Sequence, residues 1–284
     1  MKTDYIIITP CKNEEKNIEK LICSVTRQII KPKLWVIVND GSTDKTENIV
    51  KFYQKKYNWI KIMNLKRGKR DLTYHISEVI RKGFKYAFHY CMKNKINCSF
   101  VANLDADIIL PKEYYQALLF NFAKDSKLGI ASGNIVSFHK GKSIHETYRK
   151  DSPPGAIRLI RKSCYDDING IPLTYSSWDA ASNAKAVIKG WNVEVINNIF
   201  ATQERVTSSA DGIWNGWFTK GESYYYLGYR ILFACAKTVS LFFKFQIIQG
   251  TAFFVGYAGF VFSKKHKIAD LEVRNYFGSR SILR

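Results

Sequence analysis

Two aspartates separated by one residue, Asp105 and Asp107, have the residue type and spacing that can bind a divalent cation. They follow the apolar run 100–104, which is typical of a buried strand, and Pro111 ends the loop soon afterwards. If the strand continued, both carboxylates would lie on one side, where their oxygens suit Mg²⁺ or Mn²⁺ and a diphosphate. The alternative interpretation is that they only form a turn or cap a helix.

A second acidic loop runs from Asp40 to Asp44, after another apolar run. The Asp40 carboxylate can accept a hydrogen bond from a nucleic-base N–H, while Gly41 permits a tight turn. Asp44 favours the N-terminus of a following helix. An ordinary Asp-Gly turn followed by a cap explains the same residues without a ligand.

A third polar segment, residues 9–15 (Thr-Pro-Cys-Lys-Asn-Glu-Glu), ends the first apolar run. Asn13 is expected to cap the following helix, and acidic residues in a first turn stabilise a helix whether or not they contact a ligand. The capping interpretation therefore explains part of this segment by itself.

Strand and helix patterns alternate through the first half of the chain and predict where these three segments lie. Repeated strand–helix units predict a Rossmann-like, mostly parallel sheet flanked by helices, which binds ligands at the carboxyl ends of its strands. We expect strands at 5–9 (ended by Pro10), 34–38, 59–65 and 99–104, and helices at 18–29, around 49–52, at 76–91 and after Pro111.

The second half of the chain is less regular. A strand-like run covers 129–138 and a helical pattern covers 180–189. Beyond Trp214 aromatic residues accumulate, followed by two apolar stretches at 231–243 and 245–262. We therefore expect an α/β domain at residues 1–213 and a C-terminal extension of amphipathic or apolar helices at 214–284.

The composition limits the classes of partner. The 284 residues carry 44 Lys and Arg against 24 Asp and Glu, a net charge of +20, and 46% of them are hydrophobic. Such a chain can bury a core and attracts a polyanion: a nucleic acid, an acidic membrane or a phosphorylated substrate. The six cysteines lack disulfide or zinc spacing, and the N-terminal run is too short for a signal peptide, so we expect a cytoplasmic chain with buried thiols.

Basic residues in the C-terminal extension favour a membrane surface. Arg230, Lys237 and Lys244 are spaced by seven and so share one helical face, and the cluster 264–267 reinforces them. This arrangement favours helices that lie in the headgroup region, peripheral to the cytosolic membrane face. A membrane-spanning segment within 245–263 and ordinary core or dimer helices are the alternatives.

The three polar segments together, in this order and spacing, resemble glycosyltransferase family 2, with the glycosyltransferase A fold, over roughly residues 4–205. The resemblance implies a nucleotide-sugar-binding catalytic domain at 1–213. It implies a nucleoside-diphosphate sugar donor, a glycan or lipid-linked acceptor and bound Mg²⁺ or Mn²⁺. In the family the segment that corresponds to residues 9–15 lines the nucleotide pocket, Asp40 reads the base, and Asp105 and Asp107 hold metal and diphosphate. The donor-binding residues implied are Thr9, Pro10, Cys11, Asn13, Glu14, Asp40, Lys69 and Asp105.

The resemblance also implies a catalytic base. The family usually has Glu-Asp where this chain has Trp178-Asp179, so the role of base falls on Asp179. Trp178 is expected either to stack on an acceptor sugar or to fill core, and Arg158 and Arg205 are further acceptor or phosphate candidates. Relatives often carry a metal-assisting His after the base. This chain has none there, and Gln203 or Glu204 is the expected substitute.

These assignments predict an inverting, metal-dependent glycosyltransferase. Three other classes remain as alternatives: a haloacid-dehalogenase-type phosphatase, a nucleotidyltransferase and a non-enzymatic nucleic-acid-binding protein. The first would place Asp-x-Asp after its first strand, and the second would have a glycine-rich first loop. No nucleic-acid recognition motif is present and the basic residues are dispersed, so no nucleic acid is expected as a partner.

Overall fold

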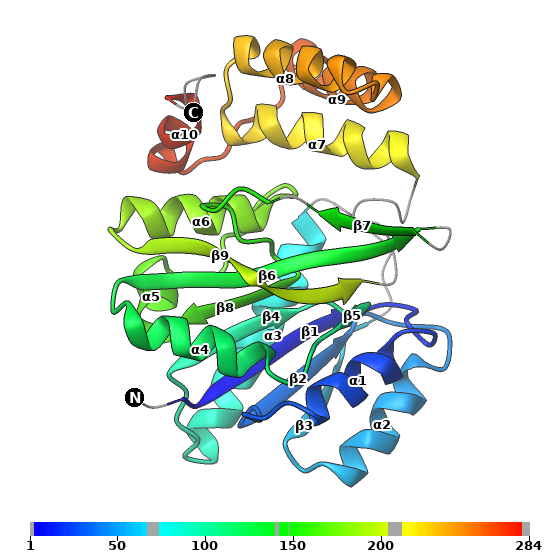
Figure 1. Ribbon diagram of the computed structural model, residues 1–284, viewed down its shortest axis with the longest axis vertical. Coiled ribbons are helices and arrows are strands. Elements are labelled where there is room, and N and C mark those ends of the chain that lie inside the picture. Colours follow the sequence, from blue (N-terminus) through cyan, green and yellow to red (C-terminus); the bar gives the residue numbers. More distant parts are fainter. Residues whose placement is uncertain (1–2, 67–73, 140–141, 147, 204–211, 280–284) are drawn as a thin grey trace.

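The computed structural model describes residues 3–66, 74–139, 142–146, 148–203 and 212–279, and one mixed sheet runs through its centre (Figure 1). Within these residues the sheet order is β3-β2-β1-β4-β8-β6-β9-β5, with β7 on β6. The four strands β1 to β4 are mutually parallel, as predicted, and β8 joins them antiparallel. The strands are β1 (Tyr5–Cys11), β2 (Leu34–Asn39), β3 (Ile60–Asn64), β4 (Phe100–Leu104), β5 (Ile108–Ile109), β6 (Leu128–His139), β7 (Lys142–Glu146), β8 (Ile157–Arg161) and β9 (Asn192–Gln203).

Helices cover both faces of this sheet, which confirms the predicted mixed α/β fold. They are α1 (Ile18–Thr26), α2 (Thr46–Lys56), α3 (Tyr74–Lys93), α4 (Tyr114–Lys124), α5 (Lys162–Asp167) and α6 (Trp178–Ile188), followed by α7 (Ile213–Leu227), α8 (Ile231–Phe243), α9 (Ile247–Phe262) and α10 (Leu271–Gly278). The first helix stops at Thr26, earlier than its apolar pattern indicates, and Ile29 is exposed.

Two hydrophobic cores, one on each face of the sheet, follow from the alternation of β-strand side chains. Tyr5 and Ile7 of β1 pack in the core that contains α1 and α4 residues. Ile6 and Ile8 pack in the other core, which contains Phe84 of α3. Because both faces are covered, β1 and β2 read as continuous apolar runs rather than alternating ones.

The first strand does not end at Pro10, as the sequence predicts, but continues to Cys11. The physical reason lies in the register. β4 pairs with β1 only from Tyr5 to Ile8, whereas β2 pairs with β1 as far as Cys11. Pro10 therefore lies where β1 has lost one neighbour, and the missing proline N–H is tolerated there.

The helices α7 to α10 form a C-terminal helical unit that lies beyond α6, on the side away from the sheet centre (Figure 1). A small hydrophobic cluster joins α7 and α10 to α6 through Ala181, Ala184, Tyr226, Val273 and Phe277. The described helices include none that is both long enough and apolar enough to cross a bilayer.

The cysteine prediction is only partly right. All six thiols are free, and Cys11, Cys91 and Cys164 are buried, but Cys235 on α8 is exposed. A free thiol on α8 is exposed because the outward side of that helix is not covered by the rest of the described chain.

Candidate active site

The polar segments 9–15 and 40–44 bind each other at the carboxyl ends of β1 and β2. Asn13 has a left-handed backbone (φ 55°), and its Oδ1 accepts a hydrogen bond from the Thr43 N–H at 2.8 Å. The Glu14 N–H in turn donates to Thr46 Oγ1 at 2.8 Å. The prediction that Asn13 caps α1 is therefore wrong. Asn17 occupies the cap position, and the Asn13 side chain holds the two loops together.

Two of the predicted donor-binding side chains face the core instead. Thr9 is fully buried, and its Oγ1 accepts the indole N–H of Trp35 at 2.9 Å. Cys11 is buried in the same core, where desolvation raises the pKa of its thiol. Both point to the α1 face because β-strand side chains alternate, so Thr9 and Cys11 can contribute only their backbone to donor contact, whereas Pro10 is half-buried.

Asp40 is buried behind these two loops, among polar side chains. Its Oδ2 is bound by Lys12 Nζ at 3.3 Å and by His75 Nε2 at 2.8 Å. Its Oδ1 is buried and has no hydrogen-bond partner among the described residues. A buried carboxylate oxygen without a partner is costly, so this atom is suited to accept a donor N–H from a ligand.

His75 is a site residue that the sequence analysis missed. It lies near the start of α3 and contacts Asp40 across 35 positions in the sequence. No spacing rule connects the two residues, and a histidine in the first turn of a helix carries no signal of its own.

Asp105 and Asp107 lie in a turn rather than on a continuing strand. β4 ends at Leu104, and the Ile108 N–H donates to the Asp105 carbonyl at 3.4 Å, which reverses the chain into β5. The sequence-based alternation argument for this pair is therefore wrong, although both carboxylates are still delivered to the same sheet edge. Gln203 Nε2 donates to Asp107 Oδ2 at 3.2 Å, so Gln203, one of the two expected substitutes for the missing histidine, lies beside this pair.

The environment of Asp105 is strongly acidic. Burial and the neighbouring charges of Asp107, Asp179 and Glu14 together raise the pKa of Asp105 to about 7, against a lowering hydrogen bond from Asn103. Such a cluster of carboxylates fits a divalent cation, whose preferred ligands are carboxylate oxygens. Within the described residues, however, no three His, Cys, Asp or Glu side chains are grouped to hold a metal.

Asp179 is joined to the Asp105 loop by a short chain of hydrogen bonds. Asn103 Nδ2 donates to Asp105 Oδ1 at 3.1 Å and to the Gly155 carbonyl at 2.9 Å. The Gly155 N–H donates to Asp179 Oδ2 at 3.3 Å. A Cβ at Gly155 would lie 2.8 Å from the Trp178 ring and 3.2 Å from Asp179 Cβ, so only glycine permits this approach. The predicted base and the predicted metal ligands therefore meet at one edge.

The N-terminus of α6, which carries Asp179, has an unusual backbone. Ser176 and Ser177 both have left-handed φ angles, 51° and 44°. Side chains other than glycine rarely adopt this region, and such conformations concentrate at functional sites. This turn aims the first residues of α6 toward Gly155 and the end of β4.

Trp178 fills core, which was one of its two predicted roles, and Arg158 is buried rather than open to an acceptor. Trp178 is 7% exposed and stacks on the Arg158 guanidinium, 4.9 Å from its ring centre. Arg158 is fully buried and donates to the carbonyls of Pro153, Pro154 and Asp179. Its burial lowers its pKa to about 10. This pair is a structural support for Asp179. Lys69, Glu204 and Arg205 lie outside the described residues.

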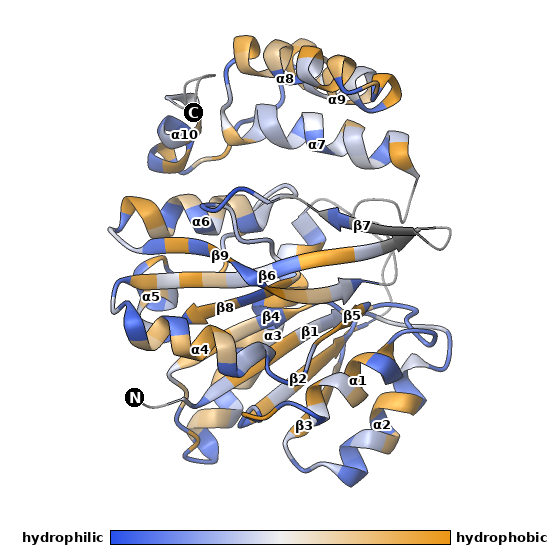
Figure 2. Ribbon diagram, in the orientation of Figure 1, coloured by the Kyte–Doolittle hydropathy of each residue, from blue (hydrophilic) through white to orange (hydrophobic). Residues whose placement is uncertain are grey.

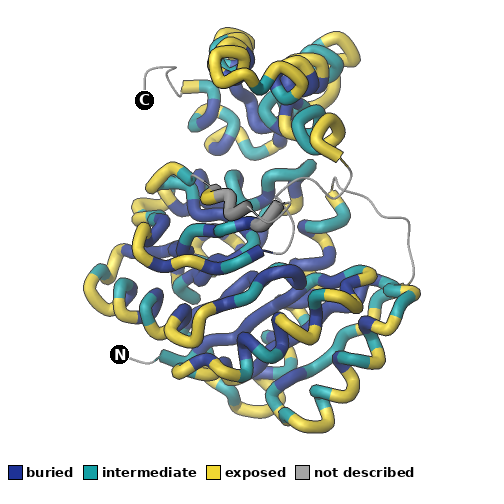
Figure 3. Tube along the Cα trace, turned by 45° about the vertical axis from the view of Figure 1, so that its right-hand side comes forward, coloured by how far each residue is buried: buried dark blue, intermediate teal, exposed yellow. Residues whose placement is uncertain are grey.

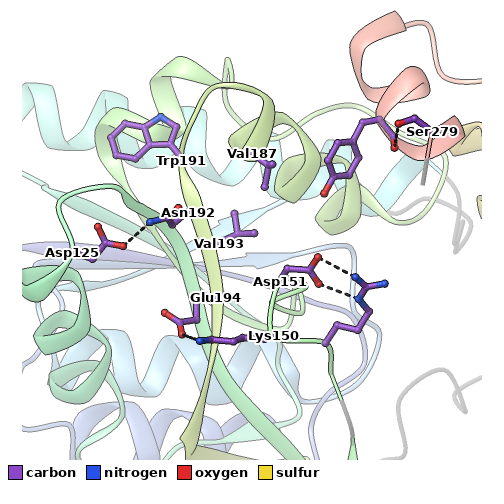
Figure 4. Close-up of a pocket in the computed structure, with 11 residues that line it drawn as sticks. Asp125, Lys150, Asp151, Val187, Trp191, Asn192, Val193, Glu194 and Ser279 are labelled. Carbon is purple, nitrogen blue, oxygen red and sulfur yellow. Dashed lines mark hydrogen bonds and ion pairs between the residues drawn. The ribbon is translucent and has the colours of Figure 1, made fainter. Parts of the chain in front are cut away.

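A large surface pocket lies elsewhere and contains none of the predicted site residues. It has a volume of about 860 Å³ and opens at the C-terminal end of α6, beside Val187 and Trp191 (Figure 4). Its charged side chains are paired with each other, for example Lys150 with Glu194 at 3.1 Å. Asp179 lies at the other end of α6, so this pocket is separate from the acidic edge.

The fold and this acidic edge are those of a glycosyltransferase, and the chain belongs to glycosyl transferase family 2, whose model matches residues 6–177. Among curated proteins it is similar to poly-beta-1,6-N-acetyl-D-glucosamine synthase. The Staphylococcus epidermidis protein is 26% identical over 72% of this chain and 50% of its own length. The Staphylococcus aureus protein is 28% identical over 65% of this chain and 46% of its own. The chain thus spans about half the length of these relatives.

Solved structures confirm the glycosyltransferase A fold. S. aureus TarS in complex with UDP aligns with a TM-score of 0.55 and 19% identity over 77% of this chain and 64% of that one. The mannosyltransferase PcManGT from Pyrobaculum calidifontis, in complex with GDP-Man and Mn²⁺, aligns with a TM-score of 0.57 and 14% identity, over 77% and 61%. Family membership sets aside the phosphatase, nucleotidyltransferase and nucleic-acid-binding alternatives.

The pKa of Asp105 predicts how metal binding depends on pH. Because a divalent cation competes with the proton on this carboxyl, the affinity for Mn²⁺ should fall about tenfold for each unit below pH 7 and level off above it. Calorimetric titration of Mn²⁺ between pH 5.5 and 8 measures this slope. Asp105→Asn should bind weakly and without the slope, and an equally steep slope in that variant would assign the titration to another group.

The raised pKa of Asp105 also predicts that neutralising this carboxyl stabilises the metal-free protein at high pH. The folded-state pKa is raised, so the metal-free protein loses stability as pH rises from about 4 to 7. Asp105→Asn, which removes the buried charge, should raise the Tm of metal-free protein at pH 8 by about 3 °C or more and leave it nearly unchanged at pH 4.5. A lower Tm at pH 8 would contradict the assignment.

Proposed function

We propose that this chain moves a sugar from a nucleoside-diphosphate donor to an acceptor hydroxyl, with inversion at the anomeric carbon. The observation that carries the proposal is the meeting of Asp179 with Asp105 and Asp107 at one sheet edge, linked through Asn103 and Gly155. Sheets of this type bind ligands at the carboxyl ends of their strands, where these residues lie.

Each described side chain has a part in the proposed reaction. Asp40 Oδ1 accepts an N–H of the base, and Lys12 and His75 fix its carboxylate from the other side. Asp105 and Asp107 hold Mg²⁺ or Mn²⁺, which when bound neutralises charge on the leaving diphosphate. Gln203 orients Asp107 through its amide.

Asp179 acts as the general base. It takes the proton from the acceptor hydroxyl as that oxygen forms a bond to the anomeric carbon and the bond to the diphosphate breaks. Attack opposite to the leaving group inverts the anomeric configuration in one step, and no enzyme nucleophile is needed. The Gly155 N–H and the stacked Arg158–Trp178 pair hold Asp179 in position.

The acceptor is proposed to be a glycan or a lipid-linked saccharide at the cytosolic face of a membrane. The curated relatives are synthases of a glucosamine polymer. The donors named with similar structures, UDP-GlcNAc and GDP-Man, are the first to be tested.

A thermal-shift screen of nucleoside diphosphates and their sugars, with and without Mn²⁺, tests the donor. Ligand at about 100 times its Kd should raise the Tm by about 5 °C or more, because binding only the folded state stabilises it. One base should be selected, and the shift should require the metal. No shift with any nucleotide would contradict the proposed function.

Asp40→Ala tests the proposed hydrogen bond between the nucleobase of the donor and Asp40. This variant should bind the selected nucleoside diphosphate at least tenfold more weakly, because the unpartnered Oδ1 acceptor is lost. His75→Ala should show a smaller loss. Asp166→Asn, which removes an exposed carboxylate paired with Lys162 away from the site, is the matched control. Unchanged nucleotide affinity in Asp40→Ala would reject this contact.

A further inference from the structure

The outward face of α8 and α9 exposes an unusual amount of apolar surface. Half of the large hydrophobic side chains that are exposed in the described chain lie between Ile231 and Phe262. Figure 2 shows these two helices as the most continuously hydrophobic part of the C-terminal helical unit, and Figure 3 shows much of them exposed. We use the name apolar tip for the exposed apolar residues at the two ends of α9: Phe242, Phe243, Phe245, Ile247 and Ile248 at the α8–α9 turn, and Phe262 at the opposite end. Both groups can meet one flat surface only when the hairpin lies along that surface.

The inward face of the same hairpin is already occupied. α7 and α9 touch backbone to backbone, since a Cβ at Gly221 would overlap the Phe253 carbonyl and one at Gly256 would overlap the Phe218 carbonyl. Phe253 and Tyr257 fill the small core between the helices. The helix pair is therefore fixed on α7, and its apolar tip has no room to turn inward.

The aromatic residues of the tip are held outward. Phe245 is 92% exposed, Phe243 82% and Phe262 83%. Phe245 also has a left-handed backbone (φ 57°), a conformation that is uncommon for a bulky side chain. Strained conformations persist where the surrounding structure imposes them and concentrate at functional positions. Aromatic rings in such a position are suited to the boundary between headgroups and acyl chains.

The charge around the tip has one sign. Residues 223–269 contain no Asp or Glu, and they contain Arg230, Lys237, Lys244, Lys264, Lys265 and Lys267. Lys244 directly follows α8 beside the α8–α9 turn, and Lys264 follows α9 beside Phe262, so each end of the hairpin carries a cation. A second copy of the chain on this surface would bring like charges together, because a two-fold interface places the same patch on both sides. An anionic lipid surface complements both the apolar side chains and the cations.

We propose that the apolar tip docks onto an anionic lipid bilayer. Phe243, Phe245 and Phe262 enter the headgroup–acyl boundary, and Lys244, Lys264 and Lys265 meet lipid phosphates. This surface rests on the proposed function, in which the acceptor is at a membrane, and it names the part of the chain and the class of lipid that make the contact.

Flotation with vesicles tests the surface. The full chain should bind vesicles of phosphatidylcholine with 30% phosphatidylglycerol at least tenfold more tightly than pure phosphatidylcholine, and less tightly at high salt. The triple variant F243S/F245S/F262S should lose at least tenfold in affinity. The charge variant K244Q/K264Q/K265Q should lose about fivefold for each cation removed, on the anionic vesicles only.

Matched controls separate the surface from general effects. The variant F52S/F120S removes two aromatic side chains of similar exposure, on α2 and α4, and should bind vesicles as the wild type does. Donor-induced thermal shifts and slow donor hydrolysis should be unchanged in every variant, which shows that each is folded and that the catalytic site is intact.

The outcomes are distinct. Equal vesicle binding by wild type and F243S/F245S/F262S would overturn the proposed surface. The proposed surface would also be overturned if the wild type does not bind vesicles and sediments as a dimer, while the triple variant is a monomer. That result would assign the tip to self-association. In both cases a normal donor response leaves the proposed glycosyl transfer standing. Failure of the donor response in wild type would instead reject the proposed function.

Discussion

Asp179→Asn should lower kcat for glycosyl transfer by about 10³-fold, within the range that a general base contributes. The amide cannot take the proton of the acceptor hydroxyl, but it keeps the size and most hydrogen bonds of the carboxylate. Gly155 N–H can still donate to the amide oxygen, so the turn before α6 should survive. Donor binding, measured by thermal shift, should stay within about threefold of wild type. The loss should therefore fall on kcat and spare the donor Kd.

The matched control is Glu47→Gln, which neutralises a first-turn carboxylate of another helix, α2, and tests for a general effect of lost helix-dipole stabilisation. It should leave kcat nearly unchanged. A fully active Asp179→Asn enzyme would remove Asp179 from the chemistry. A variant that instead loses donor binding would reassign it to the donor pocket.

Asp107→Ala should abolish metal-dependent donor binding and reduce transfer by about 10³-fold. Metal-assisted charge neutralisation contributes several kcal/mol to a reaction of this type, and Asp107 is one of the two carboxylates proposed to hold the metal. Chelation of wild type with EDTA should give a loss of the same size, and added Mn²⁺ or Mg²⁺ should restore wild type but not the variant.

Gln203→Leu is the companion variant, because it removes the amide that donates to Asp107 while keeping similar volume. It should weaken Mn²⁺ binding less than Asp107→Ala and shift the metal dependence of kcat to higher concentration. Full activity of wild type in EDTA, with no residual metal detected, would reject metal dependence for this chain.

The sequence predicted the location of the acidic edge better than the geometry within it. The repeated strand–helix units correctly placed Asp40, Asp105 and the segment 9–15 at one edge of the sheet. The resemblance added Asp179, which no pattern of spacing connects to Asp105. Burial could not be read in the same way: Arg158 and Trp178 looked like acceptor contacts, but they stack on each other in the core.

His75 and Asn103 show two kinds of missed residue. His75 meets Asp40 only because α3 crosses behind β2, a tertiary contact that leaves no local pattern. Asn103 did carry a signal, since a polar residue interrupts the apolar strand just before Asp105. Its amide turns out to join Asp105 to Gly155. A buried amide in a strand beside a predicted metal-binding pair is thus worth treating as a candidate.

The fold was predicted well where strand and helix alternate and poorly where they do not. The four parallel strands were found within a few residues. β5, β7, β8 and β9 were not predicted. Strands as short as Ile108–Ile109 have no recognisable period. β5 and β8 pair with β9 and β6, which supply partners distant in sequence.

The contacts between the C-terminal helical unit and the loop before α6 have a thermodynamic consequence. Tyr175 donates to Glu222 of α7 at 2.6 Å and stacks near Phe260 of α9, and it stands four residues before Asp179. A displacement of α7 and α9 on a bilayer would thus move Tyr175 and, through it, the proposed base Asp179. Such linkage is reciprocal: if lipid contact changes the affinity for donor by some factor, donor must change the affinity for lipid by the same factor. If lipid contact strengthens donor binding, the donor-loaded enzyme stays at the bilayer longer than the empty one; if it weakens donor binding, the empty enzyme stays longer.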